Sequence, residues 1–285
     1  MSKTRKPHKK VSLSFLVSII IPVYGRFDLL KKCLDAIPDA LGDLSYEVII
    51  IDNASPIEEK GDFYPKAVLP PNTKVIFNSK NMGFPAACNK GFKLCSGALL
   101  FFLNSDVILN KGSIEILVRA MDSPGVGVAG MKLLFPSEGE LSEAQLKHSV
   151  VQRSPDTIQH VGLFTNIHGD VTHMYLGWRA DHPRANKLRD VFAVTGAAFM
   201  TRKQLYKELG GFDEIYGMGT YEEVDFCMKV KEQHLKIIVE PAAVGIHYTG
   251  ATGEKFQMAF PLNKNRTVFT QRWYNKLVWS EWQAW

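Results

Sequence analysis

The chain has 285 residues, of which 46% are hydrophobic and 22% are charged, so it is long enough for one large α/β domain or two small ones. Its net charge of +5 comes from residues 1–10, which hold five basic residues and no acidic one. Subtracting those five from the 34 basic residues leaves 29, equal to the 29 acidic residues. The predicted body is therefore neutral, which argues against a broad basic binding face, and residues 1–14 form a basic, flexible tail.

The sequence also argues against a transmembrane or disulfide-stapled protein. No run of 18 apolar residues occurs, and the apolar stretch at 15–24 is too short to span a bilayer. That stretch also lacks the small-residue cleavage pattern of a signal peptide. The four cysteines form no C-x-x-C pair and lie among apolar neighbours, which predicts reduced core residues and a cytoplasmic location: Cys33, Cys88, Cys95 and Cys227.

The first half of the chain alternates apolar strand patterns with helical spacing. We expect helices at 29–38, 85–95 and 114–121, and strands at 15–21, 46–51, 74–77, 99–103 and 126–130. This alternation is typical of parallel βαβ units, so it predicts a Rossmann-like half.

The strand predicted at residues 99–103 organises this half. All five residues are large and apolar, which indicates a strand buried on both faces. Asn104, Ser105 and Asp106 follow it directly. The carboxyl ends of such strands line the ligand crevice of an open α/β sheet, and a carboxylate there suits a divalent cation bound to a diphosphate. The simpler alternative is an ordinary polar turn.

The second half has a weaker pattern. Residues 135–189 are polar and hold several histidines, and we interpret them as an acceptor-side insertion with short strands, a candidate mobile lid. A strand broken at Gly196 spans 190–200, a helix spans 222–233, and a strand spans 236–240. The chain ends in an aromatic segment with basic neighbours, which would suit a partner or a membrane interface: Trp273, Trp279, Trp282 and Trp285.

Seven short motifs in this order resemble glycosyltransferase family 2, especially its rhamnosyltransferase-like branch, over residues 15–250. The motifs span 20–24, 51–55, 81–89, 103–106, 195–197, 211–214 and 221–225. The resemblance implies the α/β GT-A fold, in which a Rossmann-like nucleotide-binding half with a central, mostly parallel sheet is fused to an acceptor-binding half. On this basis we expect a nucleotide-sugar half at 15–130, an acceptor-binding and catalytic half at 131–262, and an aromatic segment at 263–285.

The resemblance also implies site residues. Asp106 and His247 would bind a divalent cation, Mn²⁺ or Mg²⁺. Glu223 lies where the family usually has the Asp that acts as base, with Glu222 and Asp225 as alternatives. The residues implied for the nucleotide sugar are Pro22, Tyr24, Arg26, Asp52, Asn53, Asn81, Gly83, Asn89, Asn104, Ser105, Gly196 and Ala197.

The chemistry of sugar transfer agrees with these roles. Cleavage of a sugar–phosphate bond leaves extra negative charge on a nucleoside diphosphate, which a divalent cation neutralises. A single displacement also needs a base for the acceptor hydroxyl. We therefore expect an inverting glycosyltransferase that uses a nucleotide-diphosphate sugar. Taken singly, however, Asp52 could cap a turn, the acids at 222–225 could complement a helix dipole, and His247 could be structural.

Three alternatives remain open from sequence. The basic tail and the C-terminal aromatics would suit a non-catalytic nucleic-acid-binding module, since basic residues contact phosphates and aromatic rings stack on bases. The same features would suit a glycosyltransferase that acts on a modified nucleic-acid base. They would also suit a peripheral membrane enzyme with a lipid-linked glycan as acceptor, in place of a soluble acceptor glycan.

Overall fold

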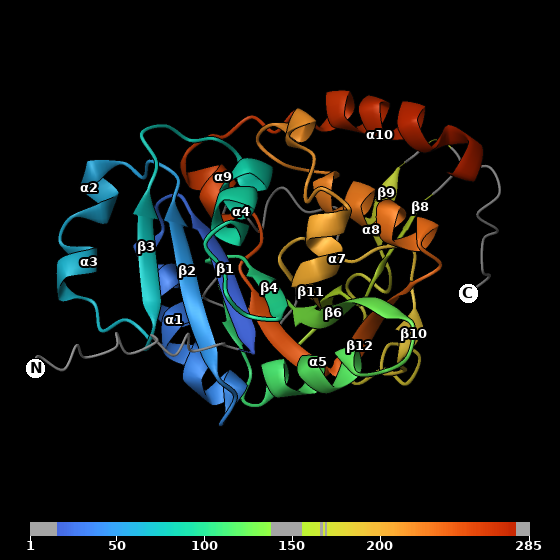
Figure 1. Ribbon diagram of the computed structural model, residues 1–285, viewed down its shortest axis with the longest axis horizontal. Coiled ribbons are helices and arrows are strands. Elements are labelled where there is room, and N and C mark those ends of the chain that lie inside the picture. The colour runs from blue at the N-terminus through green and yellow to red at the C-terminus, as the bar shows by residue number, and fades with distance from the viewer. Residues whose placement is uncertain (1–15, 138–155, 166–167, 169, 278–285) are drawn as a thin grey trace, which may run out of the picture.

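The computed structural model describes residues 16–137, 156–165, 168 and 170–277 (Figure 1). The described part is built on one ten-stranded sheet and one two-stranded sheet, β8 (Leu163–Thr165) with β9 (Val171–His173). The strands of the large sheet are β1 (Val17–Val23), β2 (Tyr46–Asp52), β3 (Thr73–Phe77), β4 (Leu99–Leu103), β5 (Val107–Leu109), β6 (Val126–Leu134), β7 (Ile158–His160), β10 (Arg189–Asp190), β11 (Ala198–Arg202) and β12 (Lys236–His247).

The large sheet runs in the order β10-β12-β6-β11-β4-β1-β2-β3, with β5 paired to β12 and β7 paired to β6. Strands β4, β1, β2 and β3 are parallel, as predicted for a Rossmann-like half. Strand β11 lies antiparallel between β4 and β6, so the whole sheet is mixed rather than mostly parallel. This insertion joins the two halves into one continuous sheet.

Helices cover both faces of the sheet. Their bounds are α1 (Phe27–Leu41), α2 (Ile57–Lys60), α3 (Phe63–Lys66), α4 (Phe84–Phe92), α5 (Ser113–Met121), α7 (Lys203–Glu208), the 3₁₀ turn η1 (Glu214–Tyr216), α8 (Glu222–Glu232), α9 (Ala251–Lys255) and α10 (Leu262–Leu277). Residues of α1 and α5 share one buried cluster with Ile19 and Phe101, whereas residues of α4 and α8 share the other with Ile20 and Phe102. Strand β4 is thus buried on both faces, as its composition predicts.

Several element boundaries differ from the sequence-based expectation. Helix α1 continues through Pro38 because Ala40 and Leu41 are fully buried, and this burial outweighs the helix-breaking tendency of proline. Helix α4 ends at Phe92 rather than at residue 95. Strand β6 runs on to Leu134.

The two strands predicted around residues 190–240 also differ. The expected strand over 190–200 is divided: β10 ends at Asp190, and β11 begins only at Ala198, after the break at Gly196. Strand β12 continues past Glu240 to His247, with a register shift between Glu240 and Val244. The extension matters because it carries His247 to the carboxyl end of β4.

Some predicted features lie outside the described residues: the basic tail at 1–14, part of the candidate lid at 138–155, and Trp279, Trp282 and Trp285. Trp273 is described, and it is buried within α10. Within the described ranges, every helix is too short or too polar to cross a membrane. All four cysteines are buried and free.

Candidate active site

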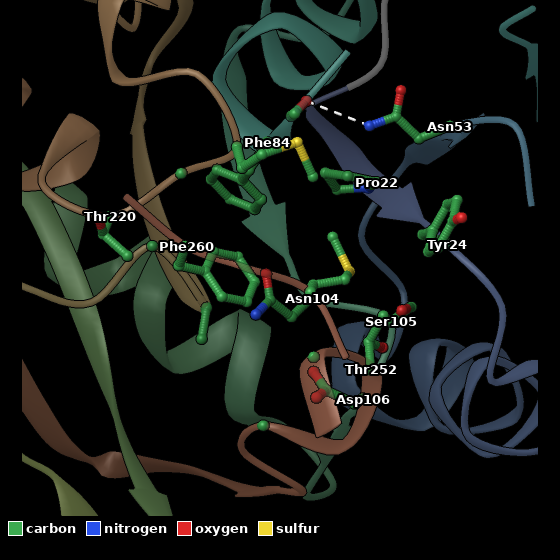
Figure 2. Close-up of a pocket in the computed structure, with 18 of the residues that line it drawn as sticks. Pro22, Tyr24, Asn53, Phe84, Asn104, Ser105, Asp106, Thr220, Thr252 and Phe260 are labelled. Atoms are coloured by element: carbon green, nitrogen blue, oxygen red, sulfur yellow. Dashed lines mark hydrogen bonds between the residues drawn. The ribbon is translucent and has the colours of Figure 1, made fainter. Parts of the chain in front are cut away.

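A cavity of about 310 Å³ opens where β1 and β4 end (Figure 2). Residues from motifs that are far apart in the sequence line this cavity, because the carboxyl ends of parallel strands meet at one edge of a sheet. The predicted residues in its wall are Pro22, Tyr24, Asn53, Asn81, Gly83, Asn104, Ser105, Asp106, Gly196, Ala197, Glu222, Glu223 and His247. The remaining predicted residues, Arg26, Asp52, Asn89 and Asp225, lie outside the wall.

Asp106 and His247 meet through strand pairing. Strand β5 begins directly after Asp106 and pairs antiparallel with β12, where Val107 is the partner of His247. The His247 Nε2 therefore lies 3.4 Å from the Asp106 carboxylate. On its other side, His247 Nδ1 contacts Gln159 Oε1 at 3.3 Å and Thr249 Oγ1 at 3.1 Å, and these contacts orient the ring.

These two side chains fit a divalent cation. A carboxylate oxygen and a neutral imidazole nitrogen are ligands that Mn²⁺ accepts, and Mg²⁺ is usually held by one or two carboxylates plus phosphates and water. In the part of the chain that the structure describes, no cluster of three or more His, Cys, Asp or Glu side chains could form a complete protein cage. The protein would thus supply a minority of the ligands and leave positions for a diphosphate.

An amide network shapes the side of the cavity next to β2. Asn53 Nδ2 donates to Asn81 Oδ1 at 2.8 Å and to the Gly83 carbonyl at 3.2 Å. Asn53 Oδ1 accepts from the backbone N–H of Met82 at 3.0 Å. Since one amide bridges the end of β2 to the loop before α4, this wall of the cavity is held in a single arrangement.

Three predicted ligands support the walls instead of lining them. Asp52 is buried, and its Oδ1 accepts from the backbone N–H of Ser55 at 2.8 Å. Asn89 Nδ2 donates to the Phe212 carbonyl at 2.9 Å, which ties α4 to the second half of the chain. Arg26 pairs with Asp28 at 2.8 Å and donates to the Ala251 carbonyl of α9 at 3.4 Å. Motif matching did not separate such supporting roles from direct contact.

Other lining residues were not predicted at all. The segment around α9 covers one side of the cavity with Gly250, Thr252, Gly253, Met258 and Phe260. Within that segment the Phe256 ring packs edge-on to Tyr24, with centroids 5.1 Å apart. The sequence carried no motif there, and only the aromatic and glycine content of the segment could have pointed to it.

The loop before α4 touches the second half of the chain at Gly83. Its φ of 81° lies in the left-handed region, and a Cβ there would lie 2.0 Å from the Gly217 carbonyl oxygen. The next residue, Phe84, donates its backbone N–H to the Met218 carbonyl at 3.3 Å. Only glycine allows this approach, so Gly83 seals the cavity between the two halves.

Glu222 and Glu223 face the cavity from the first turn of α8. Glu222 is only 4% exposed, and burial, together with the Glu223 charge, raises its pKa well above the ordinary value. Burial raises the pKa of Glu223 as well, against the lowering effect of backbone N–H groups that include those of Gly196 and Val224. Among the described residues, Oε2 of each carboxylate lacks a hydrogen-bond partner.

A second cavity of about 160 Å³ adjoins the first. Both cavities are lined by Thr195, Thr220 and Glu223. Glu223 therefore stands at the boundary between them, whereas Glu222 lines the first cavity alone. A carboxylate in this position can reach groups bound on either side.

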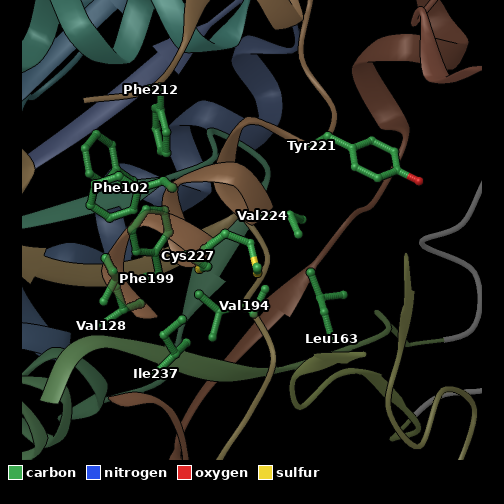
Figure 3. Close-up of a cluster of buried hydrophobic side chains, with 14 of the residues drawn as sticks. Phe102, Val128, Leu163, Val194, Phe199, Phe212, Tyr221, Val224, Cys227 and Ile237 are labelled. Atoms are coloured by element: carbon green, nitrogen blue, oxygen red, sulfur yellow. The ribbon is translucent and has the colours of Figure 1, made fainter. Parts of the chain in front are cut away.

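The rest of α8 is fixed from behind by apolar packing (Figure 3). Val224 and Cys227 belong to the buried cluster that also holds Phe199 and Phe212. The rings of Phe102 and Phe199 stack with centroids 5.0 Å apart. This packing holds the first turn of α8, and with it Glu223, in place against the sheet.

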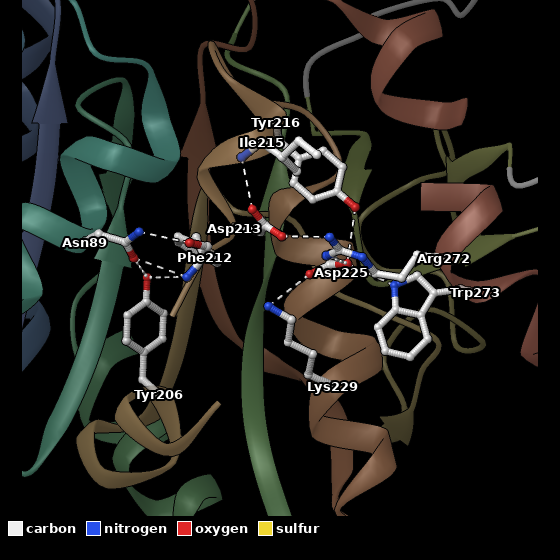
Figure 4. Close-up of polar contacts among 10 residues, drawn as sticks. All are labelled: Asn89, Tyr206, Phe212, Asp213, Ile215, Tyr216, Asp225, Lys229, Arg272 and Trp273. Carbon is white, nitrogen blue, oxygen red and sulfur yellow. Dashed lines mark hydrogen bonds and ion pairs between the residues drawn. The ribbon is translucent and has the colours of Figure 1, made fainter. Parts of the chain in front are cut away.

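Asp225 points away from both cavities, toward α10 (Figure 4). It is fully buried, and its Oδ1 accepts from Arg272 at 2.7 Å, from Trp273 Nε1 at 2.9 Å and from the Tyr216 hydroxyl at 3.2 Å. Lys229 lies 3.2 Å from its other oxygen. The alternative assignment of Asp225 as base is therefore corrected: helical geometry turns it away from Glu223 into a structural ion-pair cluster.

Comparison with known proteins gives a consistent family. The model of glycosyl transferase family 2 matches residues 18–210. The O-antigen biosynthesis protein RfbC of Myxococcus xanthus is 28% identical over 244 residues, which cover 83% of this chain and 17% of that protein. Glycosyltransferase AglE of Haloferax volcanii is 29% identical over 170 residues, which cover 53% of this chain and 56% of that protein. The chain thus spans less than two thirds of these relatives.

Solved structures show the same fold. GalNAc-T7 with UDP, GalNAc and Mn²⁺ superposes with a TM-score of 0.63 at 13% identity, over 94% of this chain and 49% of that one. The mannosyltransferase PcManGT of Pyrobaculum calidifontis, in complex with GDP-Man and Mn²⁺, gives 0.52 at 15% identity, over 85% of this chain and 59% of that one. The expected GT-A fold is confirmed.

Proposed function

The chain belongs to glycosyltransferase family 2, and on this premise we propose that it transfers a sugar from a nucleotide-diphosphate sugar to an acceptor hydroxyl with inversion. One observation carries the proposal: the Asp106–His247 pair and Glu223 face the same cavity from different elements. The arrangement offers charge neutralisation for a leaving group and, across the cavity, a base for an incoming hydroxyl.

On the donor side, Asp106 and His247 would hold a divalent cation whose chemistry is to neutralise the charge of the departing diphosphate. The side chain of Gln159 keeps His247 Nε2 turned toward that position by its contact with Nδ1. Tyr24, Asn53 and Asn81 line the same cavity and suit contacts to the nucleotide. Gly196 lies beside Glu223, and together with Asn104 in the same cavity wall it suits contacts to the sugar.

On the acceptor side, Glu223 would take the proton from the attacking hydroxyl. The acceptor oxygen then bonds to the anomeric carbon while the carbon–oxygen bond to the diphosphate breaks, and this single displacement inverts the anomeric centre. A raised pKa suits a carboxylate that must accept a proton near neutrality. Glu222 is buried beside it, and because burial and the Glu223 charge raise its pKa, it suits the neutral form.

The donor can be identified by measuring the thermal unfolding of the protein with a panel of nucleotide sugars, each with and without Mn²⁺. A ligand that binds the folded state raises the unfolding temperature. We expect at least one nucleotide sugar to stabilise the protein in a metal-dependent way. Asp106→Asn should abolish the metal-dependent part, because it removes one of two protein ligands.

Asp35→Asn, in which an exposed carboxylate of α1 is changed, is the matched control and should behave as the unmodified protein. The metal role of Asp106 would be contradicted if nucleotide sugars stabilised Asp106→Asn, Asp35→Asn and the unmodified protein equally, with no effect of Mn²⁺. An absence of stabilisation by every nucleotide sugar would contradict the proposed donor.

The acceptor is proposed as a glycan. One relative is named an O-antigen biosynthesis protein, which favours a glycan over other acceptors. The nucleic-acid and membrane alternatives depended on residues 1–14 and on the aromatic, basic segment at 263–285. In its described part, Trp273 is buried and Arg272 pairs with Asp213 and Asp225, so the described residues add no observation that favours these alternatives. Family membership favours an enzyme over a pure binding module. A cytoplasmic location, with or without peripheral membrane contact, stays a prediction.

A further inference from the structure

The second cavity, here called the side cavity, has a composition of its own. It is lined by Leu163, Val171, His173, Thr195, Thr220, Tyr221, Glu223 and Val224. Its volume of about 160 Å³ is below the roughly 300–1,000 Å³ typical of sites for drug-sized ligands. The side cavity therefore suits one small ring rather than an extended chain.

The charges in this wall restrict what it can bind. Among the described residues that line the side cavity there is no lysine or arginine, and the carboxylate of Glu223 is the one acidic group. A phosphate or uronate placed here would face a carboxylate with no cation in the wall to balance it, which is costly in a partly desolvated site. The apolar side chains of Leu163, Val171 and Val224 suit the carbon faces of a neutral ring instead.

A histidine pair, of which His160 is buried and His173 is partly buried, sets the polarity of the remaining wall. His160 Nε2 accepts from the backbone N–H groups of Gly162 at 3.2 Å and of Thr195 at 3.3 Å. In a neutral ring, the proton must then reside on Nδ1, because one nitrogen accepts and the other donates. His160 Nδ1 lies 3.0 Å from His173 Nδ1, so His160 donates and His173 accepts.

The same logic fixes the proton of His173. With Nδ1 as acceptor, a neutral His173 carries its proton on Nε2, the ring nitrogen directed away from His160. Burial lowers the pKa of both rings, that of His173 to about 4, so both are neutral at pH 7. No other described residue accepts a hydrogen bond from this Nε2–H, and the ring lines the side cavity.

We propose that the side cavity binds a single neutral sugar ring of the acceptor, and that His173 donates its Nε2–H to an oxygen of that ring beside Glu223. This inference rests on the proposed glycosyl transfer and adds to it the class of acceptor and the residue that recognises it. It excludes an acceptor whose attacking group is a phosphate.

The tautomers can be measured without any ligand. In the full chain labelled with ¹⁵N-histidine, two-bond ¹H–¹⁵N correlation spectra at pH 7 distinguish Nδ1–H from Nε2–H rings. We expect the proton of His160 on Nδ1 and that of His173 on Nε2, with signals assigned through His160→Gln and His173→Gln. A proton on Nδ1 of His173, or a charged His173 ring, would overturn the inference.

Binding is then tested with methyl glycosides of neutral hexoses and N-acetylhexosamines, and with hexose 1-phosphates as the anionic counterpart. Saturation-transfer NMR is recorded on protein holding a nucleoside diphosphate and Mg²⁺, which is diamagnetic and does not broaden the signals. We expect a methyl glycoside, and no hexose 1-phosphate, to bind. His173→Phe should weaken it about 5–10-fold, as expected for one lost hydrogen bond. His173→Gln, which keeps a donor, should retain most of the affinity.

His234→Gln, in an exposed histidine after α8, is the matched control and should bind like the unmodified protein. Equal glycoside affinity in His173→Phe and unmodified protein, preferential binding of a hexose 1-phosphate, or no glycoside binding at all would overturn the inference. A separate result would be that the unmodified protein does not bind a nucleoside diphosphate. That result would refute the proposed function and this inference with it.

Discussion

Helix α8 holds three acids within four residues, and their surroundings are opposite. Asp225 is buried among donors: Arg272, Trp273, Tyr216 and Lys229 all contact it. Glu222 and Glu223, in the same first turn, face the cavity and receive only backbone N–H groups. In the described residues, neither glutamate has a cationic side chain as partner.

This contrast separates structural charge from reactive charge. A buried carboxylate that is surrounded by donors is stabilised as an anion and fixes the elements that supply those donors, here η1, α8 and α10. A buried carboxylate without such partners has a raised pKa and can exchange a proton at a useful pH. The variants below test whether the division between Asp225 and the glutamate pair is real.

Glu223→Gln should have the largest effect. The amide is close to isosteric but cannot accept a proton, so turnover should fall by about 10²–10⁴-fold, the usual contribution of general-base catalysis. Donor affinity should stay the same, because the loss belongs to the transition state. Steady-state kinetics and calorimetric titration of the donor measure the two quantities.

The reverse outcome for Glu223→Gln is equally informative. Near-normal turnover would show that Glu223 is no more than a dipole-complementing residue of the first turn. The base would then have to be another group, and the first turn of α8 would hold no reactive carboxylate at Glu223.

Asp225→Asn should affect stability rather than chemistry. The change leaves Arg272 and Lys229 facing a neutral amide, and breaking a buried ion pair costs about 3–5 kcal/mol. Because Arg272 keeps its contact with Asp213 at 2.8 Å, we expect about 2–3 kcal/mol in urea unfolding. Turnover of the folded fraction, measured at low temperature, should be unchanged.

Asp213→Asn is the matched control for this prediction. Asp213 pairs with the same arginine, but its side chain is 31% exposed, so its loss should cost about 1 kcal/mol or less. If Asp225→Asn were as stable as this control, the cluster around Asp225 would not hold α10 to α8.

The pH dependence of turnover tests whether Glu223 acts as the base. Since burial raises the pKa of Glu223, its active, ionised form is lost as pH falls through that raised value. The acid limb of the kcat profile should therefore lie above pH 4.5, the ordinary value for the group. A rate that is flat down to the ordinary value would contradict an inward-facing, desolvated base.

Sequence reasoning reached the donor half of this site more fully than the catalytic half. Asp106 follows a run of buried apolar residues, and that run alone predicts a central strand. Since ligands bind at the carboxyl ends of such strands, the run also predicts the edge of the sheet at which Asp106 lies. The parallel order of β1, β2 and β4 then brings Asn53 and Asn104 together without further information.

The catalytic half depends on pairings that leave no local signal. Strand β11 enters antiparallel between β4 and β6, and β12 extends past its predicted end to carry His247. Arg272, the partner that makes Asp225 structural, lies 47 residues away along the chain. A pattern of three acids at a helix start is the same whether the acids face a cavity or an arginine, so only the tertiary structure can separate them.

Glu222→Gln should have the smallest effect on turnover and is the sharpest test of how the pair divides its roles. If Glu222 is the neutral member, glutamine reproduces its protonated form, and turnover should change by less than about threefold, far below the usual contribution of a general base. If Glu222 were the base, turnover of this variant would instead fall by about 10²–10⁴-fold, the loss expected for Glu223→Gln.

The pH dependence of the free energy of unfolding is the second measurement for Glu222→Gln. Because the folded-state pKa of Glu222 is raised, the folded protein keeps a proton that the unfolded chain releases as pH rises above 4.5, the ordinary value for the group. Unfolding therefore releases a proton above that pH, and Glu222 makes the unmodified protein less stable as pH rises toward the folded-state value. Glu222→Gln should remove this slope and make the protein more stable near neutrality. Urea unfolding between pH 5 and pH 8 measures it, and parallel curves for the two proteins would mean that Glu222 is ionised in the folded state.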